Sequence, residues 1–197
     1  TTFFRPEHYL SPHSDLVALT VLAHQAKGHN LITRANFSTR QALHYQEYLN
    51  NELGEKPGHA WESTTRRIAS ASEDLLEYLL CSGEAPLPAP ITGTSGYAEE
   101  FSQRGPKDKQ ARSLYQLDLQ TRLLKYPCSY LIYTDSFRQL PTNMLTRLGR
   151  RMNEVLTNQD KAETWQHLSA EDRQHIHSIL LATKDHLPEV FMAQFDL

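Results

Sequence analysis

Four of the ten histidines in this chain lie between residues 13 and 44, at His13, His24, His29 and His44. Histidine is a ligand of zinc, iron and haem, so these residues are the first candidates for a metal or haem site. In one helix His13 and His24 would share a face but lie about 16 Å apart, too far to bind one ion. His24 and His29 would point about 140° apart, so they could converge only if Gly28 broke the helix.

A second arrangement would bring His24 to residues further along the chain. If the segment from about residue 36 to residue 54 packs back as a hairpin, His24 would meet His44 or Glu47. A set of two histidines and a glutamate suits zinc or iron, and His24 with His29 or His44 would suit a non-covalently bound haem. The sequence has no His-Glu-x-x-His motif and no pair of Glu-x-x-His motifs. The alternative is that these are ordinary core and capping histidines.

Residues 82–113 combine Pro and Gly with many charged residues and are predicted to form a loop-rich excursion. Loops of this kind on a helical scaffold commonly carry binding residues. The alternative is a surface Ω-loop that is pinned by Tyr97, Phe101 and Leu114. The candidate binding residues of this loop are Glu84, Tyr97, Glu99, Arg104, Lys107, Asp108 and Arg112.

Several other classes of function find no signal in the sequence. The net charge of −3 is spread over both signs, so there is no electrostatic footprint for nucleic acid. The longest apolar run, residues 16–23, is much shorter than the roughly 18 residues needed to span a bilayer. There is no nucleophile elbow, P-loop or Gly-x-Gly-x-x-Gly motif. A hydrolase acting from the central loop would need a cleft with a perturbed acid or base, which the sequence does not reveal.

Cys81 and Cys128 are the two cysteines of the chain. Their spacing matches neither a zinc site nor a motif for covalent haem attachment. In an exported protein they could form a disulfide that stabilises the fold by about 4 kcal/mol. In a cytosolic protein they would be buried free thiols. The residues alone leave both alternatives open.

The spacing of apolar residues predicts an all-α protein, a single domain over residues 1–197 with about six to eight helices. Ser11 and Pro12 predict the start of a helix whose apolar residues cover nearly its whole circumference, so we expect this helix to be central. Gly28 is either its end or a weak point within a longer helix. Residues 130–133 could be a strand, although no partner strand is evident. Further helices are predicted for residues 36–54, 61–80, 98–103, 142–157 and 170–184, the last with Ser169 and Asp172 close to a capping box.

Five stretches of the chain together resemble an uncharacterised family of predicted exported bacterial all-α proteins that is loosely associated with c-type cytochromes and periplasmic redox systems. The resemblance covers most of the chain and implies no reaction or catalytic residues. It implies a periplasmic or secreted location and, with it, a disulfide between Cys81 and Cys128. The stretches are YLSPHSDLVALTVLAHQ (9–25), HNLITRANF (29–37), SGEAPL (82–87), YPCSYLIYTDSF (126–137) and LSAEDRQHIHSILLATK (168–184).

These features lead us to expect an exported helical binding or accessory module that engages a protein partner in a periplasmic redox or electron-transfer system. The alternative is a haem- or metal-binding redox protein that uses His24 with His29 or His44. The chain begins Thr1-Thr2-Phe3 without a methionine, as expected of a mature exported protein or of a shortened chain.

Overall fold

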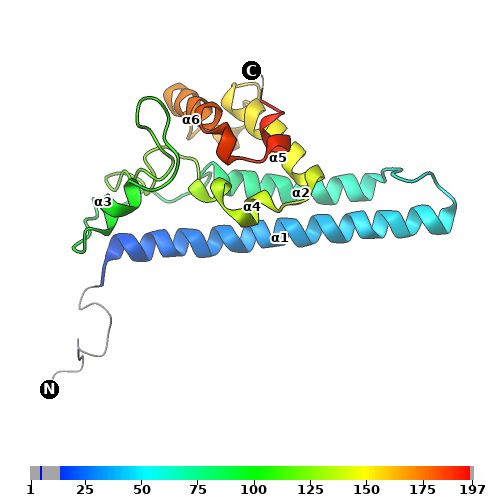
Figure 1. The fold of residues 1–197 in the computed structure, drawn as a ribbon, viewed down its shortest axis with the longest axis horizontal. Helices are drawn as coiled ribbons and strands as arrows, with labels where there is room; N and C mark the ends of the chain where they lie inside the picture. Colours follow the sequence, from blue (N-terminus) through cyan, green and yellow to red (C-terminus); the bar gives the residue numbers. More distant parts are fainter. Residues whose placement is uncertain (1–4, 6–13, 196–197) are drawn as a thin grey trace.

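The structure is a computed structural model that describes residue 5 and residues 14–195. Within these residues it is helical and contains no β-strand, which confirms the predicted all-α class. Figure 1 shows α1 and α2 as a long antiparallel hairpin, with most of the shorter helices packed along one side of it. The α-helices are α1 (Leu16–Leu53), α2 (Glu62–Leu79), α3 (Tyr97–Ser102), α4 (Asp135–Arg138), α5 (Thr142–Leu156), α6 (Ala170–Ala182) and α7 (Glu189–Met192). Short 3₁₀-helices are η2 (Tyr130–Tyr133), η3 (Glu163–Trp165) and η4 (Lys184–His186).

Helix α1 is continuous, so the separate helix predicted to begin near residue 36 is wrong. Gly28 lies within α1 and does not end it, which matches the second alternative for this residue. A Cβ atom at Gly28 would lie 2.2 Å from Cδ1 of Leu131 and 2.8 Å from Cε1 of Tyr78. The glycine therefore allows close approach of α1 to its neighbours, and the helix continues through it.

The described part of α1 has a defined cap at each end. The carboxylate of Asp15 accepts hydrogen bonds from two backbone N–H groups of the first turn, at 2.8 and 3.1 Å. At the other end Gly54 adopts the left-handed conformation, with φ of 67°. The predicted helix start at Ser11 and Pro12 lies outside the described residues, as does His13.

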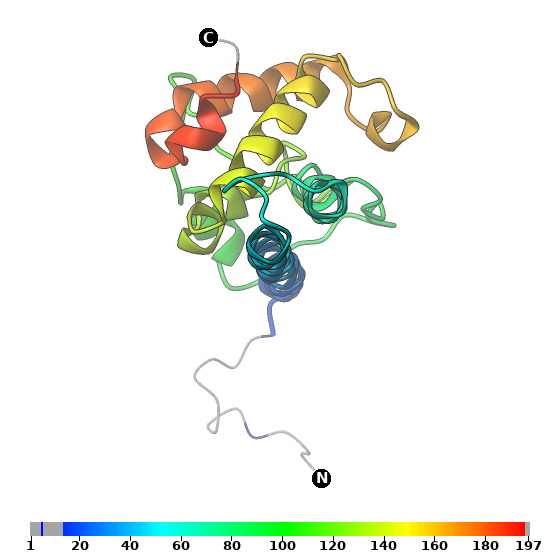
Figure 2. The ribbon, with the colours of Figure 1, turned by 90° about the vertical axis from the view of Figure 1, so that its right-hand side faces the viewer.

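Helix α1 is peripheral, so the expectation of a central helix is wrong. Val17 and Val21 are fully buried, but Leu16, Leu19 and Leu22 expose 52–58% of their surface. Figure 2 views the hairpin end-on and shows α1 at the edge of the molecule. One face of α1 packs against α2 and η2, and its other apolar residues face solvent.

The compact part of the molecule packs α5 against α2, α6 and α7 around one contiguous apolar core. The helices predicted for residues 142–157 and 170–184 are confirmed as α5 and α6. Ser169 and Asp172 form the capping box of α6, each side chain accepting from the other residue's backbone N–H. Within residues 14–195 no helix has the length and apolar character needed to cross a bilayer.

Two irregular regions connect these helices. Residues 130–133 form η2 and not a strand, because the Ser129 side chain caps the first turn. Residues 82–113 contain α3 as their regular element and are tied to the start of α1 by a 2.5 Å hydrogen bond from the Ser95 hydroxyl to Asp15. This bond and the backbone N–H groups of the helix start lower the pKa of Asp15 to about 2.

Candidate functional site

A cavity of about 260 Å³ lies between α1 and the turn that follows α2. Helix α1 contributes His24 and Lys27 to it, which lie on one face because they are three positions apart. The opposite wall comes from the last turn of α2 and the residues after it. We call this cavity the His24 pocket, and it is lined by Thr20, Ala23, His24, Lys27, Tyr78, Cys81, Ser82, Gly83, Glu84 and Leu123.

His24 is fixed by polar and aromatic contacts. Its Nε2 lies 2.8 Å from the hydroxyl of Ser129, and its ring stacks on Tyr78 with 5.0 Å between the ring centroids. The Tyr78 hydroxyl donates to the backbone carbonyl of His24. Burial, together with the nearby charge of Lys27, lowers the pKa of His24 to about 4. The imidazole is therefore neutral near pH 7 and can both donate and accept a hydrogen bond.

Cys81 adopts a left-handed backbone conformation, with φ of 57°, which is rare for residues other than glycine. The chain reverses at this point, and the N–H of Ser82 donates to the carbonyl of Glu77 at 2.8 Å, closing the end of α2. The side chain of Cys81 is buried, and its thiol is hydrogen-bonded to the Glu84 carboxyl. Burial, with the adjacent Glu84, raises the pKa of the Cys81 thiol, so the thiol is protonated near pH 7.

Glu84 lies between the His24 pocket and a neighbouring cavity of about 280 Å³. Glu84 as a whole is exposed, but burial of its carboxyl end raises the pKa of Glu84. Lys27 in the His24 pocket and Arg122 and His167 in the neighbouring cavity oppose this shift. The turn after α2 thus holds one carboxyl group within reach of basic side chains from both cavities.

The structure does not bring together the predicted metal ligands His24, His44 and Glu47. On the continuous helix His44 lies about 30 Å beyond His24, so this set is wrong because the hairpin it required does not form. His29 points to another side of α1, where its Nδ1 lies 3.2 Å from the hydroxyl of Ser136, so the predicted haem pairs do not converge either. No group of three or more His, Cys, Asp or Glu side chains in the described part of the chain is arranged to hold a metal ion.

The predicted binding loop uses several of its polar side chains within itself. Arg112 pairs with Asp108 at 2.6 Å, and the Lys107 ammonium donates to the Gln103 amide oxygen at 2.8 Å. Of the predicted loop residues only Glu84 lines the His24 pocket. The others lie on α3 and in the segment after it: Tyr97, Glu99, Arg104, Lys107, Asp108 and Arg112.

Cys81 and Cys128 are both buried free thiols, so the disulfide that the resemblance implied is not formed in the structure. The N–H of Ser129 donates to the carbonyl of Leu79 at 2.7 Å, which holds the segment of Cys128 against the end of α2. Burial raises the pKa of Cys128 to about 12, so this thiol is also protonated near pH 7.

The sequence interpretation missed Lys27, Tyr78 and Ser129. Lys27 had a usable signal, because a residue three positions after His24 shares its side of a helix. Tyr78 and Ser129 carry no local signal, since they meet His24 across 54 and 105 positions of chain. Their contribution depends on how α2 and the segment before η2 pack against α1.

Comparison with known proteins finds no match for this chain among family models, curated proteins or solved structures.

Proposed function

We propose that this protein is a helical binding module whose His24 pocket holds a small zwitterionic molecule. The observation that carries the proposal is the convergence of His24, Cys81 and Glu84, each with a shifted pKa, on one cavity. Ionisable groups perturbed by burial and gathered around a cavity are typical of binding and catalytic sites.

Lys27 and Glu84 define the class of ligand. They line the same pocket and carry groups of opposite charge, while His24 offers a neutral imidazole that can donate and accept. A molecule about the size of a free amino acid suits this lining and the cavity volume of about 260 Å³. Its carboxylate would face Lys27, and its ammonium group would face Glu84.

The chemistry of the pocket favours binding over nucleophilic catalysis. Cys81 is protonated, whereas the thiolate is the reactive form of a cysteine. Ser129 is hydrogen-bonded to His24, as in a nucleophile and base pair, but Ser129 is fully buried and does not line the pocket. Cys81 lines the cavity but is not in its reactive form, and Ser129 does not reach the cavity.

Saturation-transfer NMR on the full chain with a mixture of free amino acids tests this proposal. We expect one or more amino acids to bind, and Ala23→Leu to abolish the signal because Ala23 lines the pocket. Ala26→Leu is the matched control, since Ala26 is exposed on α1 and does not line the pocket. Absence of binding to the unmodified chain, or binding that survives Ala23→Leu, contradicts the proposal.

A second candidate function, association through the outer face of α1, is favoured by a separate observation. Seven of the eight large apolar side chains exposed in the described residues belong to α1. Six of these lie within an arc of about 140° opposite its buried face. They are Leu16, Leu19, Leu22, Phe37, Tyr45 and Tyr48, and they expose 52–66% of their surface.

The partner that fits this face best is a second copy of the chain. Six such side chains expose roughly 600 Å² of apolar surface, and one side of a stable interface buries about 800 Å², a little over half of it apolar. An antiparallel two-fold pairing of α1 that sets Leu19 against Tyr48 of the second copy also sets Leu22 against its Tyr45. Leu19 and Leu22 of each copy would thus be covered by Tyr45 and Tyr48 of the other.

Sedimentation equilibrium measures this association directly. We expect a dimer that Leu19→Glu with Leu22→Glu converts to a monomer, because both charges would be buried at the interface. Val190→Glu is the control, since Val190 is exposed on α7, away from this face. A monomer at all concentrations contradicts self-association.

From the resemblance we also propose that the protein is exported and acts in a periplasmic redox or electron-transfer system. The test is fractionation of the source cells followed by a visible spectrum of the purified protein. Recovery from the cytoplasm would contradict export, and we expect the bound ligand to be colourless.

A further inference from the structure

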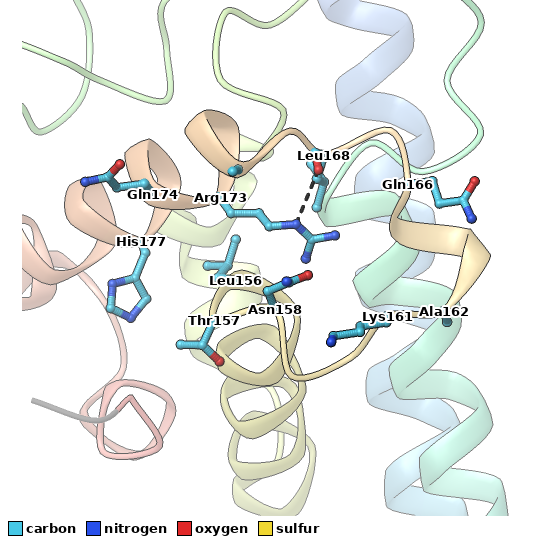
Figure 3. Close-up of a pocket in the computed structure, with 11 residues that line it drawn as sticks. Leu156, Thr157, Asn158, Lys161, Ala162, Gln166, Leu168, Arg173, Gln174 and His177 are labelled. Carbon is cyan, nitrogen blue, oxygen red and sulfur yellow. Dashed lines mark hydrogen bonds between the residues drawn. The ribbon is translucent and has the colours of Figure 1, made fainter.

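A larger cavity of about 590 Å³ lies between the C-terminal end of α5 and the first half of α6. Figure 3 shows the side chain of Arg173 reaching from α6 into this region, with its guanidinium beside Asn158. Lys161 and Gln166 lie on the segment that connects the two helices. This cavity, which we call the Arg173 cavity, shares no lining residue with the His24 pocket.

Arg173 is a buried cation that is held by neutral groups. It is 7% exposed, and its guanidinium donates to the backbone carbonyls of Val155, Trp165 (2.8 Å) and Leu168 (3.3 Å). The contact with Val155 places positive charge at the C-terminal end of α5, where it is favourable. An arginine remains charged even when burial lowers its pKa, as it does for Arg173.

The charge of Arg173 has no carboxylate in contact with it among the described residues. Asp160 interacts with Arg173 electrostatically without contacting it. The Asp160 carboxylate is instead hydrogen-bonded to Arg151 at 2.6 Å and to the Trp165 indole at 3.0 Å. No acidic side chain is present among the described residues that line the cavity. A buried charge without a counterion is costly, so an anion in the cavity would be stabilised there.

The lining supplies further groups that suit an anion. Lys161 adds a second, exposed positive charge. The side-chain amides of Asn158, Gln166 and Gln174 are neutral hydrogen-bond donors around the same space. We infer that the Arg173 cavity is a binding site for a small molecule that carries a phosphate or carboxylate group. This inference does not depend on the ligand of the His24 pocket.

NMR titration of the full, isotope-labelled chain with inorganic phosphate and, separately, with acetate tests the inference at constant ionic strength. We expect saturable shifts at Lys161, Gln166 and the side-chain Nε of Arg173 with one or both anions. Tighter binding of phosphate would identify a phosphorylated ligand, and tighter binding of acetate a carboxylated one. Absence of saturable shifts at these residues with both anions overturns the inference.

A pair of matched variants separates a site from general attraction of anions to positive charge. Lys161→Met removes a cation from the cavity without touching the buried core, and we expect it to weaken anion binding about fivefold. Lys56→Met makes the same change in the exposed turn between α1 and α2 and should leave the affinity unaltered. Equal effects of the two substitutions would contradict the site.

Discussion

Cys81 occupies a position at which helices commonly place glycine, the left-handed residue just after the last turn. A side chain in this conformation costs about 1 kcal/mol relative to glycine, and here the side chain is a thiol that contacts Glu84. Backbone strain of this kind is often found at functional sites. The strained backbone of Cys81 and its position in the lining of the His24 pocket both indicate that Cys81 belongs to the functional site.

Two substitutions at Cys81 test this strain. Both Cys81→Ala and Cys81→Gly remove the thiol, but only glycine relaxes the backbone. We expect Cys81→Gly to be more stable than Cys81→Ala by about 1 kcal/mol in urea unfolding. The order is the reverse of that expected for a residue in a helix interior, where alanine is favoured. An alanine variant as stable as the glycine variant would show that the position is not strained.

The neutral state of His24 makes stability depend on pH in a defined direction. Its pKa is about 4 in the fold and about 6.5 in an unfolded chain, so between these values the unfolded state binds the additional proton. The free energy of unfolding should therefore fall as pH drops through this window, by about 2 kcal/mol between pH 7 and pH 5. Urea unfolding at both pH values measures the loss. In His24→Gln this part of the pH dependence should disappear, and an unchanged slope would contradict the burial of a neutral imidazole.

At the scale of residues, part of the site was predictable. His24, Cys81 and Glu84 were all candidates from the sequence. His24 belongs to a segment rich in histidine, Cys81 is one of two cysteines, and Glu84 lies in the loop rich in Pro and Gly. Each was assigned to a different role, as a metal ligand, a disulfide partner and a loop residue. Their common pocket depends on the packing of α1 against the turn after α2, which no local pattern encodes.

Helix α1 is the element on which the site depends most, and Gly28 controls how closely α1 approaches its neighbours. A methyl group at Gly28 would overlap Leu131 and the ring of Tyr78, which also stacks on His24. Gly28→Ala should gain about 1 kcal/mol in helix propensity but lose more through this overlap, for a net loss of about 2 kcal/mol. Asn30→Ala, at an exposed position of the same helix, should leave stability unchanged or slightly raised.

Thermal or urea unfolding of the Gly28→Ala and Asn30→Ala variants distinguishes the two effects. A stabilised Gly28→Ala chain would mean that α1 and Tyr78 are not in close contact. The stacking of Tyr78 on His24 would then lose its structural basis.

Helices with local start and stop signals were predictable, whereas the sequence left open whether α1 ends at Gly28 or continues through it. The capping box at Ser169 and the apolar spacing of α5 and α6 are properties of short segments, so they can be interpreted without tertiary information. A glycine such as Gly28 often marks the end of a helix. Here it lies inside α1, where the absence of a side chain allows the close approach of Leu131 and Tyr78. The exposed leucines of α1 likewise indicated a central helix that the fold does not contain.

For the molecule as a whole, one long-range contact organises the site. The backbone bond from Ser129 to Leu79 joins the end of α2 to the segment before η2, and the Ser129 hydroxyl then reaches His24 on α1. Three parts of the chain are thus held together around one cavity. The Arg173 cavity is built from α5, α6 and their connection, so the two cavities are formed by different parts of the chain.

We propose that a small zwitterion binds between His24, Lys27 and Glu84. The most direct measurement is the NMR signal of the His24 imidazole nitrogens during titration of the full chain with free amino acids. We expect a saturable shift of these signals and of the Glu84 carboxyl carbon, with one affinity for both. Binding that leaves the signals of both side chains unchanged, or no saturable shift with any amino acid, would contradict a zwitterion site in this pocket.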